Sequence, residues 1–179
     1  MTASLLTAST LDESLIAEFF GRSEGQWRSE RRYYTLPDGD TKEMVSIIQV
    51  RFLEQGCPEL CKLAQLHGLV DEAAMVCGAE VSWDAANSVT GRRESRGHTL
   101  FGALGNILYR DRGFATPKPV IAEYYFINPD TLCLRTEYKG SKFEEELKLV
   151  GNQYRTRQTI ISHEGEQQMI GQYLEKRIA

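Results

Sequence analysis

Alternating hydrophobic and polar residues in the final third of the chain predict a meander of antiparallel strands. From Pro119 onward, five short β-type runs follow one another: PVIAEYYFI, TLCLRTEY, KFEEELKLV, QYRTRQTII and QQMIGQYLEKRI. Each gap between them contains Gly, Pro, Asn or Asp, the residues that provide the backbone dihedrals of tight turns. Because a meander leaves its edge strands unpaired, it requires either a second sheet or closure on itself.

The first two thirds of the chain predict about five further strands. Two are expected at residues 26–36 and 42–53, joined by a Pro-Asp-Gly-Asp turn that makes them a hairpin. Three more, each bounded by Gly or Asn, are expected at AMVCGAEVSWD, RGHTLFGAL and GNILYRDR. The total is about ten strands, connected in sequential order.

Two helices are predicted beside the strands. Apolar residues recur at helical spacing over about residues 10–21, after a cap at Ser9 or Thr10. This helix has an aromatic end and is expected to lie against the barrel or to cap an opening of it. Pro58 suits a first helical turn and Gly68 a terminus, so a short second helix is expected between strands.

The polarity of both strand faces favours a barrel with a cavity. In the strand at 131–138, Leu132 and Leu134 alternate with Arg135 and Glu137, and neither face is wholly apolar. A dry core would not accept that polarity, whereas a polar-lined pocket would. We therefore predict an all-β protein: an antiparallel up-and-down barrel of the lipocalin or calycin type, as a single domain over residues 1–179, with the barrel at about 26–178.

Composition narrows the classes of function. The chain has 179 residues, 41% of them hydrophobic, and a net charge of −4 with both signs interspersed. No basic footprint for nucleic acid is present, so no nucleic-acid partner is expected. No apolar stretch approaches the roughly 20 residues needed to cross a bilayer, and the start lacks the basic region of a signal peptide. A soluble intracellular protein without a membrane span is expected.

The cysteines and histidines form no metal-ligand pattern. Four cysteines lie at positions 57, 61, 77 and 133, and three histidines are scattered along the chain. The main interpretation is that the cysteines are reduced and pack as small hydrophobic residues. The spacing of Cys57 and Cys61 would place both thiols on one helix face, which leaves redox or metal chemistry open as a minor alternative.

A Gly-x-Trp at the start of the first strand is similar to the structural signature of calycin barrels. Here it is Gly25-Gln26-Trp27, and Arg177 near the end of the last strand is placed to cover the indole by a cation-π contact. Two interpretations of Trp27 follow: a plug for the barrel floor, or a ring that stacks on a bound ligand.

The segment FFGRSEGQWRSERRYYTL resembles the opening of the S/U-type phycobiliprotein chromophore lyases. The shared positions are Ser23, Gly25, Trp27, Ser29 and Arg31. The resemblance continues in CGAEVSWD, LCLRTEY and the C-terminal RQTI…MIGQYLEKRI, so it covers most of the chain. The sequence departs from the commoner pattern at RYY (32–34) and at EYYF (123–126), which leaves open which bilin and which acceptor cysteine are served.

The resemblance implies a lipocalin-like barrel that binds an open-chain tetrapyrrole, phycocyanobilin or a related bilin. It implies transfer of the bilin to a cysteine of a phycobiliprotein subunit of phycocyanin or allophycocyanin type, as a thioether. The bilin is then a substrate, and no prosthetic group or metal is expected. The implied location is the cyanobacterial cytoplasm or a plastid stroma, with a monomer, a homodimer and a heterodimer with a related lyase subunit all open.

A bilin carries two propionates, four pyrrolic nitrogens and flat rings, which call for arginines, a carboxylate and aromatic walls. The resemblance favours Glu123 as the acid. Arg135 is the other expected catalytic residue, and it is also a candidate, with Arg31, Arg155 and Arg157, for binding the propionates. Glu137 is a further candidate carboxylate, and the run Glu144–Glu146 is expected to be a solvated strand edge. The residues expected to contact the bilin are Trp27, Ser29, Arg31, Tyr33, Trp83, Arg155, Arg157 and Glu175.

Two alternatives to a lyase remain open. A carrier of a hydrophobic acid would use the same barrel with a single inward arginine, whereas two or more arginines beside a carboxylate suit a dipropionate. A supporting subunit of a paired lyase would have the same fold. The acceptor subunit supplies its own thiol, although a transient bilin adduct on Cys77 or Cys133 is conceivable.

Overall fold

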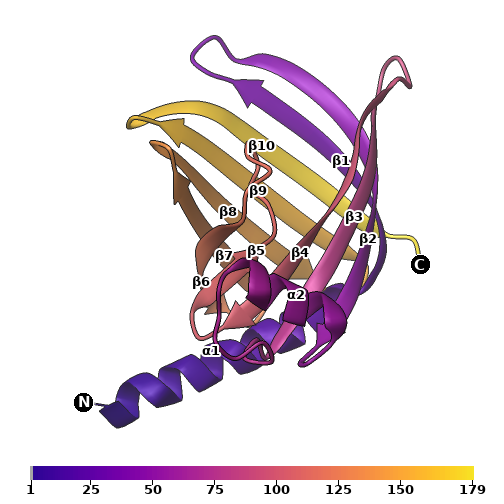
Figure 1. Ribbon diagram of the computed structural model, residues 1–179. Coiled ribbons are helices and arrows are strands. Elements are labelled where there is room, and N and C mark those ends of the chain that lie inside the picture. The colour runs from indigo at the N-terminus through magenta and orange to yellow at the C-terminus, as the bar shows by residue number, and fades with distance from the viewer. Residues whose placement is uncertain (1) are drawn as a thin grey trace.

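Ten antiparallel strands form a closed barrel in this computed structural model, and two helices pack on it (Figure 1). The structure describes the backbone of residues 2–179 and the side chains of residues 11–179. The helices are α1 (Thr2–Ser23) and α2 (Pro58–Leu66). The strands are β1 (Gly25–Thr35), β2 (Asp40–Glu54), β3 (Cys77–Asn87), β4 (Arg93–Leu104), β5 (Ile107–Arg110), β6 (Val120–Asn128), β7 (Thr131–Tyr138), β8 (Ser141–Val150), β9 (Tyr154–His163) and β10 (Glu166–Arg177).

Each strand pairs with its neighbours in sequence, and β1 pairs with both β2 and β10. The last contact joins the first strand to the last, with Trp27 opposite Arg177. Closure pairs the backbone N–H and C=O groups that the edge strands of an open meander would leave without hydrogen-bond partners. The predicted up-and-down barrel and its strand count are confirmed.

Helix α1 begins earlier than predicted. The sequence favoured a start after a cap at Ser9 or Thr10, but the helix runs from Thr2 to Ser23 and both residues lie inside it. Residues 2–20 contain no Gly or Pro, and alanine and leucine in this stretch favour helix, so the two hydroxyl residues do not interrupt it. The short helix predicted after Pro58 is present as α2.

The end of α1 and the barrel floor form one hydrophobic core. Ile16, Phe19 and Phe20 of α1 are buried in the same cluster as Trp27 of β1 and Ile48 of β2. Figure 1 shows α1 across one end of the barrel, with the β1–β2 and β9–β10 turns at the other end. Helix α1 therefore closes one end, and the side chains near the turns are free to be polar.

Helix α2 packs on the outside of the wall. Leu60, Leu63 and Ala64 of α2 form a second buried cluster with Leu53 of β2 and Leu100 of β4. These strand residues break the inward pattern of their neighbours because they face α2. Among residues 2–179, no helix has both the length and the apolar character needed to cross a membrane.

Candidate functional site

A cavity of about 720 Å³ lies inside the barrel, within the range of roughly 300–1,000 Å³ typical of small-molecule sites. Trp83, Phe101 and Phe114 are among its aromatic walls. Side chains from the turn end of the barrel, such as Thr35 and Met169, also line it. The charged residues that line the cavity are Arg31, Lys42, Arg110, Arg112, Glu145, Arg155 and Arg157.

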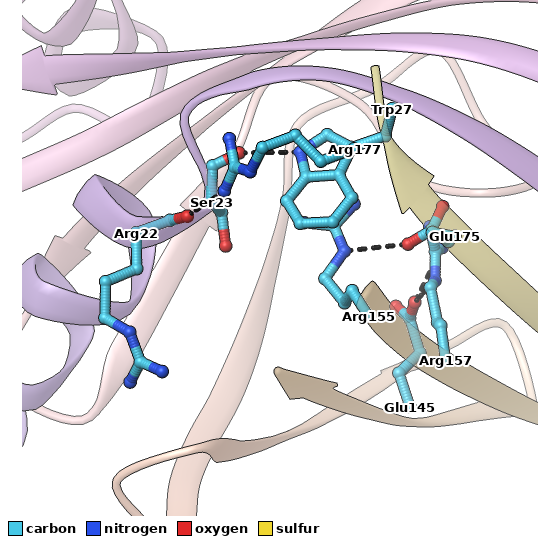
Figure 2. Close-up of polar contacts among 8 residues, drawn as sticks. All are labelled: Arg22, Ser23, Trp27, Glu145, Arg155, Arg157, Glu175 and Arg177. Carbon is cyan, nitrogen blue, oxygen red and sulfur yellow. Dashed lines mark hydrogen bonds and ion pairs between the residues drawn. The ribbon is translucent and has the colours of Figure 1, made fainter. Parts of the chain in front are cut away.

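The floor beneath this cavity is built around Trp27, which is 0% exposed. The guanidinium carbon of Arg177 lies 4.3 Å from the centre of the indole, and the indole Nε1 donates a hydrogen bond to the Ser23 carbonyl at 2.9 Å. Arg177 also donates to the Arg22 carbonyl at 2.6 Å (Figure 2). The burial of the ring beneath Arg177 agrees with the plug interpretation of Trp27, and its contact with a ligand stays a prediction.

Gly25 is required where β1 starts. Its φ of +126° is one that other residues rarely adopt, and an added Cβ would lie 2.6 Å from both the Ala179 carbonyl oxygen and Arg177 Nη1. The Gly-x-Trp pattern therefore has a steric cause: glycine lets the C-terminus and Arg177 approach the floor.

A buried ion pair lies directly above the floor. Arg155 Nε donates to Glu175 Oε1 at 2.7 Å, and the two side chains are 6% and 0% exposed (Figure 2). Burial alone would raise the pKa of the Glu175 carboxyl, but Arg155 and Arg157 outweigh burial and hold that pKa below its usual value. Glu175 is therefore ionised, and Ser29 lies opposite it on β1.

A second pair joins β9 to β8. Arg157 donates from Nη2 and Nε to Glu145 Oε2, at 2.8 and 3.2 Å. Burial alone would lower the pKa of the Arg157 guanidinium, but Glu145 and Tyr173 raise it above its usual value. The expectation that Glu144–Glu146 form a solvated edge is wrong for Glu145, whose side chain is 4% exposed, because strand alternation turns the middle residue inward.

Arg31 and two tyrosines form a third polar group. The Arg31 guanidinium carbon lies 5.4 Å from the centre of the Tyr173 ring, and Arg31 Nη1 lies 3.5 Å from the Tyr33 hydroxyl oxygen. The rings of Tyr33 and Tyr173 meet edge to face at 5.8 Å. Arg157 lies over the same Tyr173 ring at 4.8 Å, so both arginines lie around one tyrosine.

Trp83 lies in the wall of the cavity, on β3. Its Nε1 donates to Ser95 Oγ at 3.0 Å, and the Arg112 guanidinium lies 5.6 Å from its ring centre. A Cβ on Gly97 would lie 2.8 Å from the ring, so this glycine allows the indole to lie flat along β4. Trp83 thus lines the cavity, and its contact with a ligand stays a prediction.

Glu123 and Arg135 do not face the cavity, which is contrary to expectation. They pair across β6 and β7 on the outer face, and Arg135 donates to Glu137 at 2.6 Å with 51% of its side chain exposed. The physical reason is alternation: Leu134 and Thr136 of the same strand are buried. On the outer face, Glu123 and Arg135 cannot contact a ligand that is bound inside the barrel.

Arg110 was missed by the sequence analysis. It ends β5, is only 6% exposed and lies 4.7 Å from the ring centre of Phe101 and 5.1 Å from that of Phe114. A signal was available, because Leu108 is apolar and alternation places residue 110 on the same face. The short strand gave too few positions for that pattern to be noticed.

Three cysteines are poor nucleophiles in this environment. Burial, reinforced by Glu13, raises the pKa of the Cys77 thiol to about 12. Burial also raises the pKa values of Cys57 and Cys133 above the ordinary thiol value. Among the described residues, no group of three or more His, Cys, Asp and Glu side chains is arranged to hold a metal ion.

A closed barrel with an arginine-covered tryptophan floor and a polar cavity defines a lipocalin-like ligand-binding protein. A family profile described as "CpeS-like protein" matches residues 15–178. The chain therefore belongs to the CpeS-like protein family.

Comparisons with similar proteins support this family assignment. The chain is 69% identical over 169 residues to "Putative phycocyanobilin lyase CpcS 2" of Nostoc sp. (strain PCC 7120 / SAG 25.82 / UTEX 2576), and the match covers 94% of each chain. It is 47% identical over 161 residues to "Putative chromophore lyase CpcV" of Picosynechococcus sp., which covers 89% of this chain and 80% of the relative. The solved structure of the S-type phycobiliprotein lyase CPES from Guillardia theta has a TM-score of 0.77 at 20% identity, over 92% of this chain and 93% of that one, which supports the barrel fold.

Proposed function

We propose that this protein is a phycobiliprotein chromophore lyase. It binds an open-chain tetrapyrrole, phycocyanobilin or a related bilin, and promotes thioether attachment to a cysteine of a phycobiliprotein subunit. Family membership supports this function, as do the names of the similar proteins. The observation that carries the proposal is the cavity, where several inward arginines and a carboxylate lie among aromatic walls.

The cavity chemistry matches the chemistry of a bilin. Guanidinium groups bind carboxylates by paired hydrogen bonds, which suits the two propionates. Glu145 lines the cavity while paired to Arg157, so its carboxylate can accept hydrogen bonds from pyrrolic N–H groups. Trp83 and Phe101 provide flat surfaces for the rings.

The transfer step is an addition. The sulfur of the acceptor cysteine forms a bond to carbon at the exocyclic double bond of the A-ring, while the thiol proton is transferred to the other carbon of that double bond. Atoms and electrons balance without an oxidant or reductant. Raised thiol pKa values at Cys57, Cys77 and Cys133 favour the acceptor cysteine as nucleophile. The barrel then accelerates the reaction by holding one bilin conformer and presenting it to one thiol.

The proposed partner is a phycobiliprotein subunit of phycocyanin or allophycocyanin type, in the cyanobacterial cytoplasm or a plastid stroma. Three active forms are compatible with this proposal: a monomer, a homodimer and a heterodimer with a related lyase subunit. No prosthetic group is proposed, because the bilin is the substrate.

A carrier of a single hydrophobic acid is the second candidate function. One inward arginine would suffice for one carboxylate, but Arg31 and Arg110 both line the cavity without an ion-pair partner among the described residues. This number favours a ligand with more than one acidic group over a fatty acid.

Co-expression with a bilin source and one phycobiliprotein subunit tests the proposal. The expected result is a subunit that carries a covalent chromophore, visible by fluorescence on a denaturing gel, and no chromophore when this chain is omitted. A second culture adds a related lyase subunit. Chromophore only in the second culture would make this chain a supporting subunit, and chromophore in neither would contradict the function.

A further inference from the structure

Arg110 differs from the other buried arginine of the barrel, Arg155, in having no carboxylate partner. Among the residues whose side chains the structure describes, Arg110 Nε and Nη1 are buried and make no hydrogen bond. Arg155, in contrast, pairs with Glu175. The Arg110 guanidinium instead packs against the rings of Phe101 and Phe114 and faces the cavity.

The nearest acid in sequence does not neutralise this charge. Asp111 Oδ1 accepts hydrogen bonds from Thr99 Oγ1 at 2.8 Å and from the Leu100 N–H at 2.9 Å, so it is engaged elsewhere. Burial lowers the pKa of the Arg110 guanidinium and outweighs the attraction of Glu145, whose carboxylate is itself paired to Arg157. An unpaired buried charge is costly for a folded protein, which indicates that Arg110 is retained for a ligand.

The charges inside the barrel do not balance. Arg155 is matched by Glu175 and Arg157 by Glu145, whereas Arg31 and Arg110 have no ion-pair partner within the described part of the chain. Arg31 Nε is also buried without a hydrogen-bond partner. Within residues 11–179, Arg112 also lines the cavity without an ion pair, but it is exposed to solvent, so Arg31 and Arg110 are the two unpaired arginines there with buried guanidinium nitrogens. They lie on β1 and β5, separated by several strands along the barrel wall whichever way one counts.

We propose that Arg110 and Arg31 each hold one carboxylate of a dicarboxylic ligand. Phe101 and Phe114 orient the Arg110 guanidinium, and Tyr33 and Tyr173 orient that of Arg31. The proposal rests on the proposed function, in which these acids are the two propionates of the bilin. It adds a specific assignment: Arg155 and Arg157 are structural partners of the two glutamates, and Arg31 and Arg110 are the anion-binding residues.

Titration with phycocyanobilin and with its dimethyl ester tests the assignment, since the ester keeps the rings but has no charged propionate. Binding is measured by the change in visible absorbance for wild type, Arg110→Gln and Arg31→Gln. Each variant is expected to bind the diacid about 10- to 100-fold more weakly, the effect of losing one charge-assisted hydrogen-bonding partner. Affinity for the ester is expected to change by less than about twofold.

Arg92→Gln is the matched control, because Arg92 is exposed in the β3–β4 turn and its loss removes the same charge. It is expected to bind both compounds as wild type does. Unchanged diacid affinity in Arg110→Gln, or an equal loss for diacid and ester, would overturn the assignment while leaving the lyase function standing. Binding of neither compound by the wild-type protein would overturn both.

Thermal unfolding of the ligand-free variants separates ligand binding from folding. Removing an unpaired buried charge is expected to leave the midpoint of Arg110→Gln at or above that of wild type. Arg155→Gln is expected to unfold at a lower temperature, because it leaves Glu175 unpaired. A lower midpoint for Arg110→Gln would show that Arg110 supports the fold, and the proposal would be wrong.

Discussion

Arg155 and Glu175 are the two most deeply buried partners of an ion pair among the described residues. Their hydrogen bond connects β9 to β10 above the Trp27 floor, where both side chains are almost completely buried. Removing one partner of such a pair typically costs about 3–5 kcal/mol, because the other charge stays buried. This pair therefore stabilises the folded barrel as long as both members are charged.

The pH dependence of stability should reveal the pair. Since the folded-state pKa of Glu175 lies below its ordinary value of about 4.3, its contribution is complete above that pH and is lost as the pH falls through the folded-state pKa. Glu175→Gln is expected to lower the free energy of unfolding at pH 7, and the gap to wild type should narrow on acidification below about pH 4. Urea unfolding at a series of pH values measures both, and a constant gap would contradict this account.

Outer-face residues provide a second test at this scale. Glu123→Gln and Arg135→Gln are expected to leave the affinity for phycocyanobilin within about twofold of wild type, because both side chains are exposed outside the barrel. Glu145→Gln, inside the cavity, is expected to weaken binding. Absorbance titration gives all three values, and a large loss in Glu123→Gln would place the outer face in the ligand site.

At the scale of elements, the junction of β1 with β10 determines whether the ring closes. The N–H of Gln26 donates to the Ala179 carbonyl at 2.8 Å, the Ile178 N–H donates to the Gln26 carbonyl at 2.8 Å, and Arg177 donates to the Asn152 carbonyl at 2.8 Å. Floor, first strand and last strand are thereby joined at one place, next to Gly25.

Gly25→Ala is expected to destabilise the barrel more than the same change at Gly39. Gly39 also has a positive φ, of +76°, but an added Cβ would meet nothing within 4 Å, so its cost is only that of the backbone conformation, roughly 1–2 kcal/mol. At Gly25 the clash with the C-terminus adds to a comparable cost. Denaturant unfolding of both variants compares them, and equal losses would show that the clash is relieved without cost.

The sequence predicted the elements better than it predicted the residues of the site. Turn residues and two-residue alternation gave the strand order, because consecutive strands are neighbours throughout the barrel and most are joined by short turns. Arg135 and Glu145 were misplaced although alternation itself assigned them correctly: Arg135 opposes the apolar face of β7, and Glu145 shares its face with Phe143. Residue chemistry was given more weight than register there. The ion-pair partners could not be predicted, since they depend on which strands the closed ring makes adjacent.

For the whole molecule, binding of a ligand inside the barrel is expected to stabilise the folded state. At a free bilin concentration of 100 times Kd, the gain is about 2.7 kcal/mol if the unfolded chain does not bind. Thermal unfolding with and without phycocyanobilin measures this gain, and Arg110→Gln should show a smaller increase at the same concentration. No increase for wild type would mean that the bilin does not bind the folded protein in preference to the unfolded chain.

The position of α1 has a consequence for turnover. Phe19, Phe20 and Trp27 pack across one end of the barrel. A ligand is therefore expected to enter and leave through the opposite end, at the turns between strands. Binding of the bilin and its transfer must then occur one after the other, because the acceptor protein has to dock at the end through which the next bilin would enter. Excess free bilin is therefore expected to slow attachment, because it competes with the acceptor protein for the open end of the barrel.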